Sequence, residues 1–88
     1  MKYILVSLRT QDGEHSYNWH YGQTVENKRG LSDVYFLNII WGKDVVKEHL
    51  VKDPYKTYLD LNYTHEEIIG YEEIALFEWN VLRKFGII

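Results

Sequence analysis

Glu26 and Lys28 have the acid-x-lysine spacing found in metal-dependent nucleases, where the acid holds the metal and the lysine polarises a phosphate or a water. Residues 22–30 around them are polar, with a glycine at each end, and predict a loop rather than a strand. Asp12, the nearest upstream aspartate, is explained more simply as a turn residue. A small metal-dependent nuclease is therefore an alternative, and the favoured prediction is a protein that is not an enzyme.

Two pairs of adjacent glutamates and two nearby histidines are the other groups that could act together. Glu66–Glu67 and Glu72–Glu73 are neighbours in sequence, and neighbouring side chains on a strand point to opposite faces. His15 and His20 are five residues apart, so on a strand they also point to opposite faces and cannot share a metal ion. The sequence therefore predicts no catalytic residues, no metal site and no cofactor.

Several classes of function lack their characteristic residues. The chain has no phosphate-binding loop, no dinucleotide-binding glycine motif, no hydrolase nucleophile elbow and no zinc-protease motif. It has no cysteine, which excludes disulfides, thiolate catalysis and cysteine-based zinc sites. The apolar run near the start is interrupted by Ser7 and Arg9 and is too short for a signal peptide or a membrane span. We therefore expect a cytoplasmic protein without membrane contact.

Acidic residues are concentrated in the second half of the chain. Basic and acidic residues nearly balance from Met1 to Lys56, whereas residues 57–82 contain no lysine or arginine and six acids: Asp60, Glu66, Glu67, Glu72, Glu73 and Glu78. An acidic surface disfavours direct binding to nucleic acid phosphates and favours a protein partner with a basic surface. We predict that these six residues contact such a partner; the alternative is a solvated face that aids solubility.

The elements that position these residues must fit in one domain, residues 1–88, because the chain is too short for a second core. Aromatic residues make up 16% of the chain, and their large side chains can fill a small core. A β-hairpin is predicted at Asp12-Gly13, the strongest short-range hairpin signal when it lies between alternating segments. With these two residues as the loop, Val6 faces Trp19 on the core side.

The middle of the chain predicts two helical segments. Ser32 can cap a helix that ends near Gly42, although the β-branched and aromatic side chains of residues 34–42 also suit a strand. The helix is expected to continue irregularly through residues 43–52 and to end before Pro54.

The last part predicts two strands and a helix. Residues 56–63 alternate as a strand. Thr64 and Glu67 match a helix capping box, but the tyrosine and isoleucine content of residues 64–74 favours a strand. Residues 75–85 predict a helix. The order ββαββα then indicates an α+β fold, a two-layer sandwich with an antiparallel sheet and helices packed on one face.

Both ends of the chain follow a recognisable pattern. The opening MKYILVSLRTQDGE predicts a hairpin, and the tail combines Glu73-Ile74, Glu78-Trp79 and the run Lys84–Ile87. In these features the chain resembles small uncharacterised bacterial and phage α+β proteins, over about a third of its length, whereas residues 23–53 depart from the pattern. The resemblance supports a strand over residues 66–74 and names no activity. It implies a phage or mobile-element origin, where proteins of this size often act as inhibitors, anti-CRISPR proteins among them.

Trp79 is predicted to anchor the partner contact. The core side of the last helix is expected to consist of Phe77, Val81, Leu82 and Phe85. Trp79 lies two residues from Phe77, about 200° round a helix, and should point away from that side. The alternative is that Trp79 covers the edge of the sheet or packs under the segment Val45–Leu50.

Tryptophan is enriched among interface anchors, and Glu72, Glu73 and Glu78 are close to Trp79 in sequence. We therefore predict a non-enzymatic protein-binding module. Its most specific form is an anti-CRISPR-like inhibitor of a nucleic-acid-handling host complex. A structural subunit of a homo-oligomer is the remaining alternative.

Overall fold

A computed structural model describes residues 1–88. Five strands form one antiparallel sheet in the order β2-β1-β5-β4-β3. The strands are β1 (Lys2–Asp12), β2 (His15–Val25), β3 (Leu50–Lys52), β4 (Thr57–Asp60) and β5 (Thr64–Ile74), and the helices are α1 (Asp33–Trp41), α2 (Lys43–His49) and α3 (Leu76–Lys84). The predicted α+β fold with an antiparallel sheet is confirmed, with one more strand than expected.

The main core lies between one face of the sheet and helices α1 and α2. Alternate residues of β1, namely Ile4, Val6 and Leu8, point into it and are almost fully buried. Phe36 and Leu37 of α1 close the core from the helix side. Burying side chains of this size contributes about 1.5–3 kcal/mol each relative to leaving them exposed. This side of the molecule is the two-layer sandwich that the sequence predicts.

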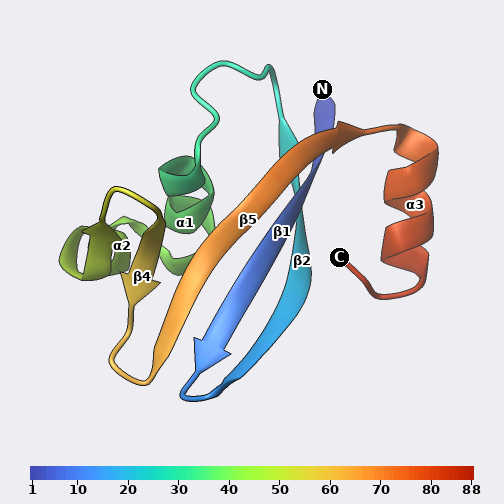
Figure 1. Cartoon of the computed structure of the whole chain (residues 1–88). Helices are drawn as coiled ribbons and strands as arrows, with labels where there is room; N and C mark the ends of the chain where they lie inside the picture. The colour runs from blue at the N-terminus through green and yellow to red at the C-terminus, as the bar shows by residue number, and fades with distance from the viewer.

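Helix α3 packs on the opposite face of the sheet (Figure 1). Its Trp79 ring lies with its centroid 5.2 Å from that of Tyr3, which points away from the main core. The same ring covers Gly22, where an added Cβ would lie 2.7 Å from it. The expectation that the helices share one face therefore holds for α1 and α2 and is wrong for α3. Glycine at position 22 creates a notch on the strand that the sequence pattern does not reveal.

The β1–β2 hairpin forms with a register different from the predicted one. Leu8, rather than Val6, lies opposite Trp19, and Asp12 pairs with His15, so the loop is Gly13-Glu14. Gly13 has a φ of 61° at the first loop position, which is typical of a type II′ turn, whereas an Asp-Gly type I′ turn needs positive φ at both residues. The shift is two residues, a full period of a strand, so every side chain stays on its predicted face.

Three further segments test the predicted boundaries. Helix α1 begins as expected, because the Ser32 hydroxyl accepts a hydrogen bond of 3.1 Å from the Tyr35 amide, and it ends at Gly42 with a φ of 95°. The predicted helix through residues 43–52 is wrong after His49, because Leu50–Lys52 form strand β3 against β4. Residues 64–74 form strand β5, so the strand interpretation is confirmed.

Candidate partner-binding surface

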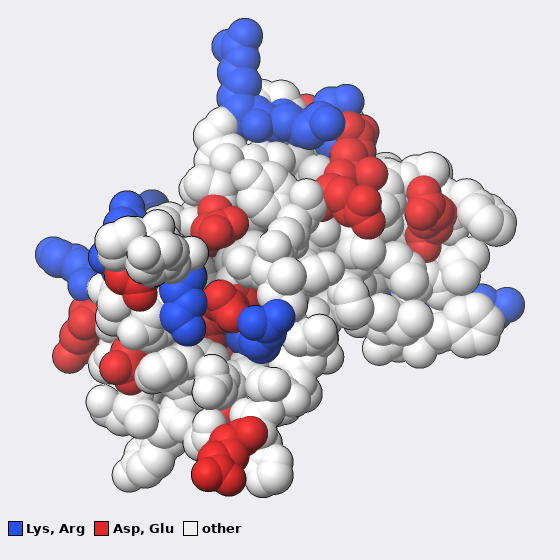
Figure 2. Space-filling view, viewed as in Figure 1, with Lys and Arg blue, Asp and Glu red and all other residues white.

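The six acidic residues predicted to contact a partner do not gather into one patch. Figure 2 shows acidic side chains separated by basic ones and by uncharged surface. Sheet pairing causes this mixing, since it brings basic residues from the first half of the chain next to the acidic strand β5. Each acid therefore has different surroundings.

Glu66 belongs to the core. Its side chain is only 6% exposed and accepts a hydrogen bond from the Thr10 hydroxyl. The same hydroxyl oxygen accepts a hydrogen bond of 2.9 Å from the Trp19 indole nitrogen. The three side chains form a hydrogen-bonded chain that crosses β2, β1 and β5. The structure therefore gives Glu66 a role inside the fold, and the prediction that it contacts a partner is wrong.

Glu67 and Glu73 are engaged in ion pairs across the sheet. Arg9 Nη1 lies 3.2 Å from Glu67 Oε1. Glu73 pairs with Lys28 at 3.1 Å and with Lys2 at 3.5 Å. The hydrogen bond from Lys28, followed by the positive charge of Lys2, lowers the pKa of Glu73 below its ordinary value. These two carboxylates therefore already have cationic partners within the protein.

The remaining three acids lie at the surface. Asp60 accepts a hydrogen bond of 3.0 Å from the Asn62 amide. Glu78 accepts one of 3.2 Å from the Ala75 amide and so caps the start of α3. Glu72 is exposed. Glu72 and Glu78 are thus the predicted acids that remain accessible close to helix α3.

We predict that Glu73→Gln destabilises the protein at neutral pH and not at acid pH. A carboxyl whose folded-state pKa is lowered contributes stability above its ordinary pKa, and this contribution is lost as the pH falls. Urea unfolding should show a lower free energy of unfolding for the variant at pH 7, and this difference should shrink as the pH falls through the lowered pKa of Glu73. Glu72→Gln is the matched control, and an equal effect of the two substitutions would contradict the assignment.

The acid-x-lysine spacing does not become a compact site. Glu26 and Lys28 lie after β2 in an exposed loop, and the Lys28 ammonium is paired with Glu73 of β5. No group of three histidine or acidic side chains lies close enough to hold a metal ion.

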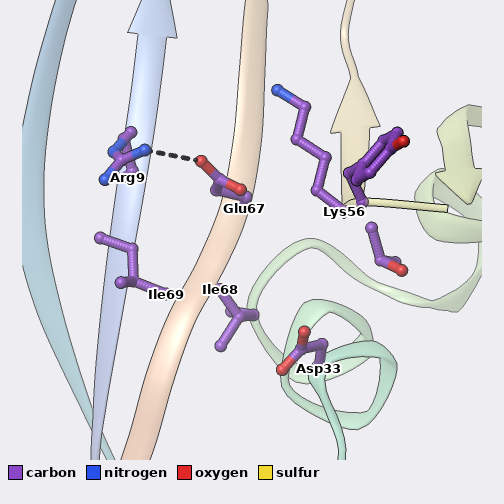
Figure 3. A pocket seen from close by; sticks show the side chains of 8 residues that line it. Arg9, Asp33, Lys56, Glu67, Ile68 and Ile69 are labelled. Atoms are coloured by element: carbon purple, nitrogen blue, oxygen red, sulfur yellow. Dashed lines mark hydrogen bonds and ion pairs between the residues drawn. The ribbon is translucent and has the colours of Figure 1, made fainter. Parts of the chain in front are cut away.

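A small polar hollow lies between β5, the start of α1 and the turn before β4 (Figure 3). Arg9 and Glu67 form its ion pair, and Asp33 and Lys56 line the other side, around a volume of about 220 Å³. Burial raises the pKa of Asp33, and the negative charge of Glu67 adds to the effect. The charges of two acidic and two basic side chains offset one another in this hollow. Its volume is below the range typical of small-molecule sites. The charge and size of the hollow therefore do not indicate a particular ligand.

The outer side of α3 is the largest departure from the sequence prediction. Trp79, expected to be exposed, is 8% exposed and faces the sheet. Phe77 and Phe85, expected in the core, are 77% and 70% exposed, and Val81 between them is also exposed. These three residues are four apart, so they form one stripe along the helix, which we call the outer stripe. The predicted orientation of α3 is therefore wrong.

The reason lies in the composition of α3, which is apolar on two sides. Trp79 and the half-buried Leu82 occupy the inner side, and the outer stripe occupies the other. Spacing alone does not choose between the two sides. The larger ring fits over Gly22 and Tyr3, and this contact decides the orientation.

Charges flank the outer stripe at both ends. Lys84 Nζ lies 5.9 Å from the centre of the Phe85 ring. Glu78 lies at the opposite end, in the first turn of the helix. Leu76 and Ile87 add further exposed apolar surface next to the stripe.

The chain matches no protein-family model, and neither a curated protein nor a solved structure shows significant similarity to it. The relationship to small bacterial and phage proteins therefore stays a prediction. Each of the helices is too short or too polar to cross a membrane.

Proposed function

We propose that the protein is a non-enzymatic protein-binding module that docks through the outer stripe of α3. The observation that carries the proposal is the exposure of Phe77 and Phe85, at 77% and 70%, on a helix already anchored by Trp79. Phenylalanine side chains in water cost free energy that burial in a partner would recover. Contiguous exposed apolar surface of this kind is typical of interaction sites.

The outer stripe suits a helix-in-groove contact. An amphipathic helix that binds in this way presents apolar anchors about one turn apart, as Phe77, Val81 and Phe85 do. The partner would offer an apolar groove, with a basic surface at the end that receives Glu72 and Glu78. Opposite charges at this end would speed the encounter, and the rings would supply the affinity.

The narrower proposal, an anti-CRISPR-like inhibitor of a nucleic-acid-handling host complex, is compatible with such a partner. Proteins that hold nucleic acids carry basic grooves, because they must neutralise phosphates. The support for this narrower function is the resemblance of the two chain ends to small phage proteins, together with the accessible acids beside α3.

Substitution of the outer stripe tests the proposal. The partner is first isolated from host lysate with the wild-type protein. Phe77→Ser and Phe85→Ser should then each weaken binding by about 2 kcal/mol, roughly 30-fold in Kd, measured by calorimetry. The far-UV circular dichroism spectrum should not change, because neither ring belongs to the core.

Tyr55→Ser and Tyr63→Ser are the matched controls, because these residues are 96% and 88% exposed and lie before β5, whereas α3 follows it. Binding that survives both α3 substitutions but is lost in a control would refute docking through the outer stripe.

A further inference from the structure

Strand β2 is an outermost strand of the sheet, and its outer edge is open. It pairs with β1 over all eleven residues without a bulge and with no other strand. The ten backbone hydrogen bonds made outside the regular elements all lie elsewhere in the chain. Of the carbonyls of β2, that of Thr24 accepts a hydrogen bond from the Gln23 side chain. The residues from His15 to Gly22 thus present a regular row of backbone donors and acceptors.

The two edges of the sheet are protected very differently. The other outermost strand, β3, is three residues long, contains Lys52 and is followed by Asp53-Pro54. Short length, lysine and proline are the usual features that keep an edge from pairing with another chain. Strand β2 has none of them, because no Lys, Arg, Asp, Glu or Pro lies between His15 and Val25. An unprotected edge of this length is typical of a strand that pairs with another.

The direction of the outward groups follows from the hairpin. Its two-residue loop closes on the pair Asp12–His15, so alternate residues of β2, beginning with His15, bond to β1. The even-numbered residues, among them Ser16, Asn18 and His20, direct their backbone groups away from β1. The side chains of these three residues are exposed, and no element of the fold covers them.

We propose that β2 pairs antiparallel with β2 of a second copy of this chain, giving a two-fold symmetric dimer with one continuous sheet. A strand without lysine, arginine, aspartate or glutamate can pair with itself without the repulsion that such charges would cause. Antiparallel self-pairing also brings even-numbered residues opposite even-numbered residues, so the open donors and acceptors match.

Aromatic side chains favour the same arrangement. Tyr17 is 58% exposed on the core-side face of β2. A two-fold axis at Asn18 places Tyr17 opposite Trp19 of the second copy, and an axis at Trp19 places it opposite Tyr21. Either register creates cross-strand aromatic pairs and removes the Tyr17 ring from water.

Mass measurement tests the dimer. In light scattering after gel filtration, the wild-type protein should have the mass of two 10.6 kDa chains. Asn18→Lys places a charge on the edge of both copies and should raise the dissociation constant at least about tenfold. Tyr63→Lys adds the same charge at an exposed loop position and should remain dimeric. A wild-type protein that is monomeric at millimolar concentration, or a dimer unaffected by Asn18→Lys, would overturn the proposal.

Cysteine cross-linking gives a second readout, because the chain has no cysteine of its own. Among Ser16→Cys, Asn18→Cys and His20→Cys, the residue nearest the two-fold axis should form an intermolecular disulfide faster than Tyr63→Cys. Equal rates at all four positions would contradict the pairing.

This interface is independent of the outer stripe. Phe77→Ser and Phe85→Ser should leave the dimer intact, and Asn18→Lys should leave partner binding by α3 in place. The failure of one proposal can therefore be distinguished from the failure of the other.

Discussion

Replacing Trp79 with alanine should lower the free energy of unfolding by roughly 3–5 kcal/mol. Trp79 is 8% exposed, and its indole packs against Tyr3 and covers the notch at Gly22, so its removal leaves a cavity between α3 and the sheet. Small domains have a total stability of about 5–15 kcal/mol, so the loss should be evident as a large shift of the urea midpoint.

Phe77→Ala is the matched control on the same helix. It removes the aromatic ring of a residue that is 77% exposed, and its effect on stability should stay within about 0.5 kcal/mol. A costly Phe77→Ala together with a neutral Trp79→Ala would restore the orientation of α3 that the sequence predicts.

The second large effect should come from Thr10→Val. The Thr10 hydroxyl is the hydrogen-bond partner of both the buried Glu66 carboxylate and the Trp19 indole nitrogen. Valine has nearly the same shape but cannot form either bond, so both groups lose this partner. We expect a loss of about 2–4 kcal/mol in the free energy of unfolding, measured by urea denaturation. Thr24→Val on the neighbouring strand should cost far less.

A double variant separates the hydrogen-bonded chain from simple packing. Thr10→Val combined with Glu66→Met removes the unpaired carboxylate together with its partner. If the two side chains act as a unit, the double variant should lose less stability than the sum of the single variants. Strictly additive losses would show that the bond between Thr10 and Glu66 contributes little.

Much of the fold follows from local signals. The Ser32 cap and Gly42 define α1, and the alternation of β1 identifies its buried face. The register of the hairpin was not predictable from the Asp-Gly signal, because two loops keep the same faces and differ only in which residues take positive φ. Strand β3 is three residues long and exists only through its pairing with β4, so it carries no periodic signal.

The candidate site was harder to predict because its determinants are distant in sequence. A count of acids along residues 57–82 does not show that Arg9, Lys2 and Lys28 lie opposite them in the folded chain. The orientation of α3 depends on Gly22, more than fifty residues away from Trp79 in the chain. The sequence does show that α3 is apolar on two sides, but it does not show which side faces the sheet.

The attachment of α3 through its inner side has a consequence for how this protein can diverge between lineages. Trp79 and Gly22 constrain each other, and a change in one demands a change in the other. The residues of the outer stripe do not belong to the buried cluster or pack against it. Substitutions in the outer stripe should therefore have little effect on folding. If the partner changes, selection can therefore replace Phe77, Val81 and Phe85 while the fold stays the same.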